Sequence, residues 1–240
     1  MKVEVIGTGS MYTKYHGACA LINEEILIDV PNGTVKQLLR TGHSLEKIKT
    51  IIITHKHGDH TADIPFLFKY LQVQNKRRNL LTIIGPKGIQ KKIVSLFKAF
   101  NFENKKQIKD LVDVQYIEIT KIQQTLKQQN NQIEAIMVSH GEEQPCYGYV
   151  INKKLGYTGD TTLCTGVEKI WQLSQIIIGD SNSNKAVSTH IHIEQIRQLL
   201  EEQINKTFIA THMGDNTREA LLKEKIPNVI IPEDGYIFEI

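Results

Sequence analysis

The sequence predicts a single α/β domain, spanning residues 1–240, in which two mixed β-sheets face each other and helices cover their outer surfaces. Short β-branched runs alternate with segments of helical periodicity along the whole chain. Turn-forming pairs, Asn23 with Glu24 and Asn152 with Lys153, join neighbouring runs as hairpins, so the sheets contain antiparallel as well as parallel strands. A chain of 240 residues without an internal repeat or linker can bury most of its apolar surface in one domain.

The predicted strands are short apolar or alternating runs bounded by polar residues. They cover residues 3–6, 18–29, 50–54, 80–84, 112–119, 133–139, 147–151, 154–157, 175–179, 207–211, 229–231 and 236–239. The polar stretch 121–132, which is rich in Gln and Asn, fits either a loop or an edge hairpin.

The predicted helices are segments with apolar residues at helical spacing. They cover residues 33–40, 61–74, 86–100, 193–203 and 216–225. Pro86 suits the first turn of the third helix, because a backbone N–H in that turn has no partner within the helix.

The composition excludes several classes of protein. At 40% hydrophobic and 23% charged residues the chain is typical of globular proteins, and no apolar run approaches the roughly 20 residues that span a bilayer. Residues 1–6 read as a strand and lack the features of a signal peptide, so we expect a cytoplasmic protein with no membrane partner. Cys19, Cys146 and Cys164 lie far apart and indicate small core residues, neither a disulfide framework nor a zinc knuckle.

One stretch of the chain is rich in lysine. The lysines concerned are Lys87, Lys91, Lys92, Lys98, Lys105, Lys106 and Lys109. A formal net charge of +3 is too small to indicate a nucleic-acid surface by itself, so we interpret this run as the solvated face of a helix.

The residues that carry chemistry follow the predicted strand 50–54. His55, His57, Asp59 and His60 lie within six positions of one another. Imidazoles and carboxylates are the usual ligands of zinc and related divalent ions, and alternate residues of an extended backbone can point the same way. A chance polar turn is a poor explanation of this density, so the segment predicts a metal-binding loop.

This segment resembles the His-x-His-x-Asp-His signature of the metallo-β-lactamase superfamily, and the resemblance extends over nearly the whole chain. His140, Asp160 and His212 match that superfamily's remaining ligands in order, each at the end of a predicted strand. The resemblance implies an αββα sandwich with two metal sites. One site consists of His55, His57 and His140, the other of Asp59, His60 and His212, and Asp160 is shared between them.

The resemblance further implies two divalent ions as cofactors. Zinc is expected, although manganese and iron accept the same ligands. Two ions about 3.5–4 Å apart allow a bridging hydroxide to attack an electrophile near neutral pH. Asp59 is a candidate to orient or deprotonate the attacking water.

Three local features resemble the ribonuclease Z branch of the superfamily: residues 85–89, residues 158–161 and the segment 188–190. The last contains His190, which matches a histidine that faces the scissile phosphate in that branch. There an imidazolium can protonate the leaving group or stabilise a phosphoryl oxygen. Asp180 matches the carboxylate that orients this histidine, although the family more often has glutamate. The alternative for His190 is a plain helix-start position beside Ser188 and Thr189.

The segment between His140 and Asp160 departs from the transfer-RNA processing enzymes. Those enzymes insert a long Gly- and Pro-rich arm here to grip RNA, whereas residues 141–159 allow only two short strands. The arm-less layout resembles cyclic-nucleotide phosphodiesterases of this branch, such as the anti-Pycsar enzymes that degrade cyclic pyrimidine mononucleotides and so evade an immune signal. The sequence therefore predicts a two-metal phosphodiesterase with a cyclic mononucleotide as substrate, and the family resemblance implies a homodimer.

Other functions stay open at this point. A ribonuclease Z-like RNA-processing nuclease would need a basic surface to hold its substrate. A thioester or lactone hydrolase would use the same metals without His190, although only 28 residues follow His212, too few for the C-terminal domain usual in glyoxalase-type enzymes. Lactam hydrolysis is disfavoured because the second site lacks cysteine. A sensor with purely structural metals is the non-enzymatic alternative.

Overall fold

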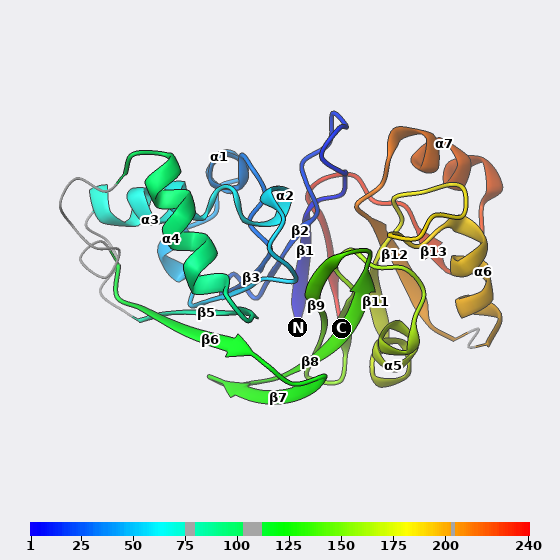
Figure 1. Cartoon of the computed structure of the whole chain (residues 1–240). Helices are drawn as coiled ribbons and strands as arrows, with labels where there is room; N and C mark the ends of the chain where they lie inside the picture. Colours follow the sequence, from blue (N-terminus) through cyan, green and yellow to red (C-terminus); the bar gives the residue numbers. More distant parts are fainter. Residues whose placement is uncertain (75–79, 103–111, 203–204) are drawn as a thin grey trace.

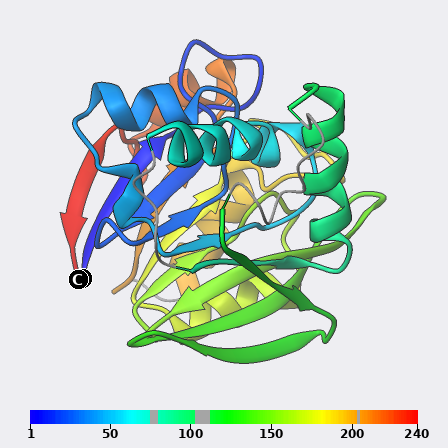
Figure 2. The same cartoon turned by 90° about the vertical axis from the view of Figure 1, so that its left-hand side faces the viewer.

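Two seven-stranded sheets face each other with helices on both outer surfaces (Figure 1, Figure 2), in a computed structural model that describes residues 1–74, 80–102, 112–202 and 205–240. The first sheet has the order β14-β1-β2-β3-β4-β5-β6 and the second β13-β12-β11-β10-β9-β8-β7. The predicted αββα arrangement with two mixed sheets is therefore confirmed.

The first sheet combines parallel and antiparallel pairing. Its strands are β1 (Lys2–Gly7), β2 (Cys19–Ile22), β3 (Ile26–Ile28), β4 (Thr50–Ile52), β5 (Leu81–Pro86), β6 (Val114–Ile119) and β14 (Tyr236–Glu239). The neighbours from β3 to β6 are parallel, whereas β1 pairs antiparallel with both β2 and β14. Positive φ angles at Asn23 and Glu24 form the tight turn between β2 and β3, so the predicted run 18–29 is two strands of a hairpin.

The second sheet contains β7 (Gln123–Gln128), β8 (Asn131–His140), β9 (Glu143–Ile151), β10 (Leu155–Tyr157), β11 (Ile176–Asp180), β12 (Thr207–Thr211) and β13 (Val229–Ile230). The strands from β10 to β13 are parallel, and those from β7 to β10 form antiparallel hairpins. The polar stretch 121–132 is thus an edge hairpin and not a loop. Asn152 and Lys153 form the predicted turn, again with positive φ.

The helices form one layer outside each sheet. Beside the first sheet lie α1 (Thr34–Arg40), α2 (Gly58–Thr61), α3 (Ile64–Val73) and α4 (Ile89–Ala99), together with a 3-10 turn at Leu45–Lys47. Beside the second lie α5 (Thr165–Leu173), α6 (Ile193–Glu202) and α7 (Asp215–Glu224). None of the helices in the described parts of the chain is long and apolar enough to cross a membrane.

The apolar core has three layers because neighbouring strand residues point to opposite faces. In β2, Ala20 and Ile22 pack between the two sheets, whereas Cys19 and Leu21 pack under the helices of the first sheet. The third layer lies under α5, α6 and α7. Cys146 belongs to that layer, and all three cysteines are free, as the sequence predicted.

Two details of the fold differ from the sequence prediction. Pro86 is not in the first turn of a helix: it ends β5 opposite Ile119, and Gly88, at φ 88°, separates it from α4, which begins at Ile89. Helix α5 was not predicted, although Val167, Ile170 and Trp171 are buried at helical spacing.

The lysine run is partly described by the structure. Lys87, Lys91 and Lys98 are exposed near or on α4, opposite buried Ile89 and Phe97, which confirms a solvated helix face there. Lys105, Lys106 and Lys109 lie outside the described residues, as does the predicted last residue of the helix 193–203.

Asp234, in the segment before β14, fixes the loop that follows β1. Its carboxylate accepts hydrogen bonds from the Thr8 backbone N–H (3.0 Å), the Thr8 hydroxyl (2.8 Å) and the His16 backbone N–H (2.7 Å). The Arg218 guanidinium donates to the Thr8 hydroxyl at 2.6 Å and lies 3.8 Å from the centre of the Tyr15 ring. Both ends of the loop are therefore tied to the C-terminal segment.

We predict that Asp234→Ala lowers the free energy of unfolding by about 2–4 kcal/mol, because it removes the acceptor of hydrogen bonds from Thr8 and His16. Denaturant unfolding followed by circular dichroism measures the change. Glu233→Ala is the matched control: that side chain is 75% exposed, so its ion pair with Arg218 contributes about 0–1 kcal/mol. Equal destabilisation by both substitutions would contradict the role of Asp234.

Candidate metal centre

Five strand ends meet at one edge of the two facing sheets and carry the predicted site residues. His55 follows β4, His140 ends β8, Asp160 follows β10, Asp180 ends β11 and His212 follows β12. His57, Asp59 and His60 lie in the loop and the short helix α2 that continue from β4. The structure thus brings together every ligand that the sequence predicted, in two neighbouring groups.

One group consists of Asp59, His60, Asp160 and His212. Nε2 of His60 lies 3.4 Å from Asp160 Oδ1 and 3.7 Å from Asp59 Oδ2. Nε2 of His212 lies 3.2 Å from Asp160 Oδ2 and 3.5 Å from Asp59 Oδ2. A tetrahedral ion with bonds of about 2.0–2.2 Å holds its ligand atoms about 3.3–3.6 Å apart. The measured separations are close to this range, with one oxygen of Asp160 facing His60 and the other facing His212, so the group can hold an ion at its centre.

The other group consists of His55, His57 and His140. Nε2 of His55 lies 3.0 Å from Nδ1 of His57. Asp160 Oδ2 is 4.0 Å from His55 Nε2 and 3.9 Å from His140 Nε2. The carboxylate of Asp160 therefore faces both groups of imidazoles, which is the position that a shared ligand requires.

Several buried atoms of this cluster have no hydrogen-bond partner among the described residues. They are Asp59 Oδ1, His60 Nε2, Asp160 Oδ1 and His212 Nε2. Buried polar atoms are normally paired, so several unpaired atoms within one cluster need a ligand. This observation, together with the mixture of imidazole and carboxylate donors, fits divalent ions.

Hydrogen bonds behind the cluster fix which imidazole nitrogen faces inwards. Nδ1 of His60 lies 2.9 Å from Asp29 Oδ2, and Asp29 also accepts from the Thr54 backbone N–H and hydroxyl. When Nδ1 of His60 donates to Asp29, Nε2 has its lone pair free for a metal. Asp29 is fully buried at the end of β3, and the sequence analysis gave it no function.

Other partners of the imidazoles were also missed from the sequence. Nδ1 of His140 donates to the Thr189 carbonyl at 2.8 Å, and the Asn182 side-chain amide lies 3.1 Å from Nδ1 of His212. Glu143 lies 3.8 Å from Nε2 of His57. No local sequence pattern connects these partners, because the two residues of each pair are 30 positions or more apart.

His190 stands beside both groups without belonging to the seven predicted ligands. Its ring centre lies 4.9 Å from that of His140 and 5.3 Å from that of His212. Nδ1 of His190 donates to Asp180 Oδ2 at 2.8 Å. Asp180 is fully buried and also accepts from the backbone N–H groups of Thr161 and Asn182. The predicted partnership of His190 with Asp180 is therefore present.

The carboxylates and imidazoles shift one another's pKa before any ion binds. Burial would raise the pKa of Asp160, but the charges of His212 and His60 hold it well below its usual range. Burial would lower the pKa of His60, but Asp160 and Asp29 raise it well above its usual value. For His190, burial would lower the pKa, but the hydrogen bond that it donates to Asp180 and the nearby carboxylate charges together raise it. Asp160 is thus charged beside a cationic His60, whereas burial lowers the pKa of His55 and of His57 and keeps these imidazoles neutral.

Several aromatic and polar residues that the sequence could not place are now located. Tyr147 and Tyr149 are buried in the core between the sheets. Tyr12 is 89% exposed in the loop after β1. Asn182 contacts His212, as described above.

Comparison with known sequences identifies relatives of this chain. A family model described as anti-Pycsar protein Apyc1 matches residues 1–231. The ribonuclease Z of Staphylococcus epidermidis is 40% identical over 127 residues, which cover 52% of this chain and 38% of that protein. The match to this curated relative therefore spans well under half of its length.

Solved structures with little sequence identity share the whole fold. YhfI of Bacillus subtilis, a metallo-β-lactamase fold protein, is 19% identical, with a TM-score of 0.78 over 100% of this chain and 99% of that one. The short form of human tRNase Z is also 19% identical, with a TM-score of 0.78 over 100% and 99% of the two chains. These likenesses show the metallo-β-lactamase fold.

The contact between Asp29 and His60 generates a prediction on metal binding. Asp29→Asn places an amide N–H2 against Nδ1 of His60 if its oxygen keeps the Thr54 N–H, and His60 must then carry its proton on Nε2. We expect metal affinity at the site of His60 to fall about 10–100-fold. Elemental analysis after dialysis measures the metal retained per chain.

The matched control for this prediction is Asp63→Asn. Asp63 is also buried, but it accepts a hydrogen bond from the Val35 backbone N–H and touches none of the predicted ligands. If Asp29→Asn keeps the metal content of the parent protein, Asp29 does not set the tautomer of His60.

Proposed function

Since the chain belongs to the family of the anti-Pycsar protein Apyc1, we propose that it is a two-metal phosphodiesterase that hydrolyses a small phosphodiester, with a cyclic mononucleotide as its substrate. The observation that carries this proposal is the pair of His190 and Asp180 beside the two groups of ligands. The proposed metal ligands are His55, His57, Asp59, His60, His140, Asp160 and His212.

The position of His190 favours phosphodiester over thioester chemistry. Its Nε2 is turned away from the bond with Asp180, and its ring lies beside those of His140 and His212. A group held there can donate a proton to a departing alkoxide or stabilise a phosphoryl oxygen. A thiolate leaving group needs no such proton, so a thioesterase would have no use for a buried pair of this kind.

The segment between His140 and Asp160 favours a small substrate. Its residues form β9, the turn at Asn152 and β10, so nothing in this fully described stretch extends from the domain to hold a large RNA. A cyclic mononucleotide needs no such extension, because both ester bonds of its phosphate belong to one compact molecule.

The residues of the chain divide the work of hydrolysis between them. Divalent ions bound to the seven ligands supply Lewis acidity and a nucleophile at neutral pH. Burial would raise the pKa of Asp59, but its interactions with His212 and His60 together lower it, so Asp59 is ionised and is our candidate to orient that nucleophile. Asp180 holds His190 with Nδ1 protonated, and His190 delivers a proton or a hydrogen bond on the leaving-group side.

A ribonuclease Z-like activity is the second candidate function. It is favoured by the 40% identity to the Staphylococcus epidermidis ribonuclease Z over 127 residues. A turnover screen with cyclic mononucleotides, a precursor transfer RNA and a thioester tests the alternatives directly. Cleavage of the RNA, with no turnover of cyclic mononucleotides, would overturn our proposal. The homodimer expected from the family stays a prediction.

We predict that the purified protein binds close to two divalent ions per chain, with zinc as the expected metal. Asp160→Ala should reduce binding at both sites, because Asp160 Oδ2 faces both groups of imidazoles. His57→Ala should retain more of the ion near His60 and His212. Elemental analysis of the three proteins measures these contents.

The control for metal content is His43→Ala, since His43 pairs with Glu4 away from the cluster. An unchanged metal content in Asp160→Ala would show that Asp160 is not the shared ligand. One ion per chain in the fully active parent protein would contradict the two-metal proposal.

We predict that His190→Ala keeps the metals and the fold but loses about 10²–10⁴-fold in kcat with a cyclic mononucleotide. The loss should be smaller with bis(p-nitrophenyl) phosphate, because the weakly basic phenolate needs little protonation to leave. His192→Ala, two residues along the same segment, is the matched control and should retain the activity of the parent.

The comparison of the two substrates decides the role of His190. Equal losses with both would favour stabilisation of the phosphoryl oxygens over proton donation. Full activity of His190→Ala with both substrates, at parental metal content, would remove the main support for phosphodiester chemistry.

A further inference from the structure

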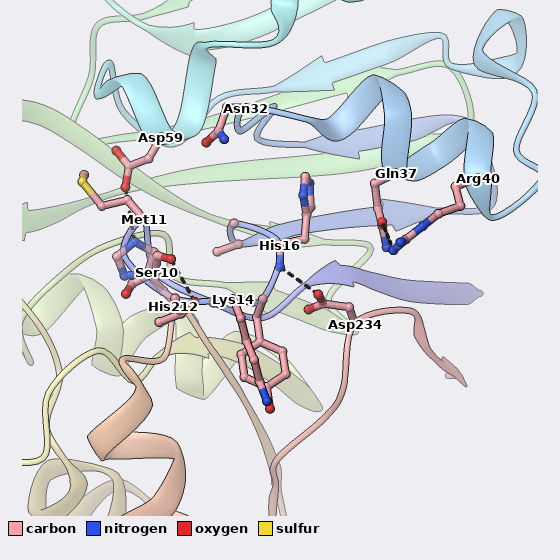
Figure 3. Close-up of a pocket in the computed structure, with 15 residues that line it drawn as sticks. Ser10, Met11, Lys14, His16, Asn32, Gln37, Arg40, Asp59, His212 and Asp234 are labelled. Atoms are coloured by element: carbon pink, nitrogen blue, oxygen red, sulfur yellow. Dashed lines mark hydrogen bonds and ion pairs between the residues drawn. The ribbon is translucent and has the colours of Figure 1, made fainter.

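A cavity of about 270 Å³ adjoins the ligand cluster and has no part in the proposed chemistry. Its walls come from the loop after β1 and from the segment that leads into α1. Figure 3 shows Asp59 and His212 at one end of this cavity and Gln37 and Arg40 at the other. The volume is close to the lower end of the roughly 300–1,000 Å³ typical of small-molecule sites. The cavity therefore extends the site away from the metals.

The far end of the cavity presents hydrogen-bond donors in a fixed arrangement. The side chain of Arg40 donates from Nη2 to Oε1 of Gln37 at 2.6 Å. Since that bond occupies the amide oxygen of Gln37, its N–H2 group is left to donate, and Gln37 is only 9% exposed. Arg40 bonds here to a neutral amide and not to a carboxylate, so this contact does not neutralise its charge. The pair is suited to a ligand with acceptor atoms.

The middle of the cavity is lined by groups that suit an uncharged ligand. His16 stands in the wall between the two ends (Figure 3), and burial outweighs Asp234 and lowers its pKa, so its imidazole is neutral. The carboxylate of Asp234 also lines the cavity and would repel a second phosphate group. Lys14 also lines the cavity, but its ammonium lies over the Tyr15 ring, 5.2 Å from the ring centre. The rest of this lining suits a neutral ring with acceptor atoms at its edge.

We propose that this cavity binds the nucleobase of the substrate and that Arg40 and Gln37 donate hydrogen bonds to its acceptor atoms. The inference rests on the proposed function, because the ligands Asp59 and His212 at the near end place the phosphate next to the cavity. Carbonyl oxygens and ring nitrogens of a base are the acceptors that a guanidinium and an amide N–H2 recognise. Arg40 and Gln37 are thus specificity-determining residues, distant from the reacting atoms.

The test compares substrates with and without a base. Arg40→Ala and Gln37→Leu should each raise KM for a cyclic mononucleotide about tenfold or more, the usual effect of losing a hydrogen bond to a charged group or of leaving an acceptor unpaired. They should leave kcat and KM for bis(p-nitrophenyl) phosphate near the parental values. Lys36→Ala is the matched control, because it removes an exposed cation from the same helix without lining the cavity.

The outcomes separate this inference from the proposed function. Unchanged KM for the cyclic mononucleotide in both variants overturns the base site and leaves the phosphodiesterase standing. Equal changes with both substrates also overturn it, because they indicate a general disturbance. A larger loss with a short oligonucleotide than with the cyclic mononucleotide assigns the cavity to a nucleic-acid strand instead. A parent protein that turns over bis(p-nitrophenyl) phosphate but no cyclic mononucleotide overturns both proposals.

Two measurements protect the test against misfolding. Arg40 is exposed, so its replacement should leave the core intact, and a melting curve and the metal content of each variant check this.

Arg40→Lys keeps the positive charge but loses the planar fork of donors. If Arg40 acts through hydrogen bonds, Arg40→Lys raises KM as Arg40→Ala does, whereas recovery of the parental KM overturns that part of the proposal.

Discussion

The charge of the Asp160 carboxylate, buried between the two sheets, is the constraint on which the site depends. A buried carboxylate is costly unless cations and hydrogen bonds surround it. Asp160 is only 3% exposed, and the imidazoles around it belong to His55 and His60 beyond β4, to His140 on β8 and to His212 beyond β12. These strands come from both sheets, so each must end at the same edge. The strand ends that bring imidazoles to Asp160 therefore also bring the other proposed ligands together.

A second set of contacts orients the imidazole rings. One of these contacts links the proposed metal ligand His140 to the segment that carries His190. The Thr189 carbonyl accepts from Nδ1 of His140, while the next residue, His190, donates to Asp180. This close packing depends on Gly141, at φ 55°, because a Cβ atom there would lie 2.9 Å from Cγ2 of Thr189. The segment that carries the proposed acid is therefore held against a predicted metal ligand, so displacement of one would disturb the other.

The sequence analysis predicted the residues of the cluster that lie close together along the chain or that match the superfamily's ligands in order. The dense segment from His55 to His60 is visible in any single sequence, and a family resemblance supplied the more distant ligands. Asp29 was missed because its bond to His60 spans 31 positions and depends on the parallel pairing of β3 with β4. Pro86 was misplaced because its pairing with β6 outweighed its preference for a first helical turn. The missed residues and boundaries are thus those that only tertiary contacts determine.

The proposed metal ligands and the wall of the cavity are built on different parts of the fold. This separation allows the same metal chemistry to act on different substrates. The proposed metal ligands stand on strands of both sheets, so their spacing follows from the sheets themselves. The cavity wall is instead a loop whose ends are tied by Asp234, while Tyr12 near its tip is 89% exposed. Loops on a rigid scaffold can change without disturbing the core. Substitutions at Arg40 or in this loop can therefore alter which molecule binds while the spacing of the ligand atoms around Asp160 stays the same.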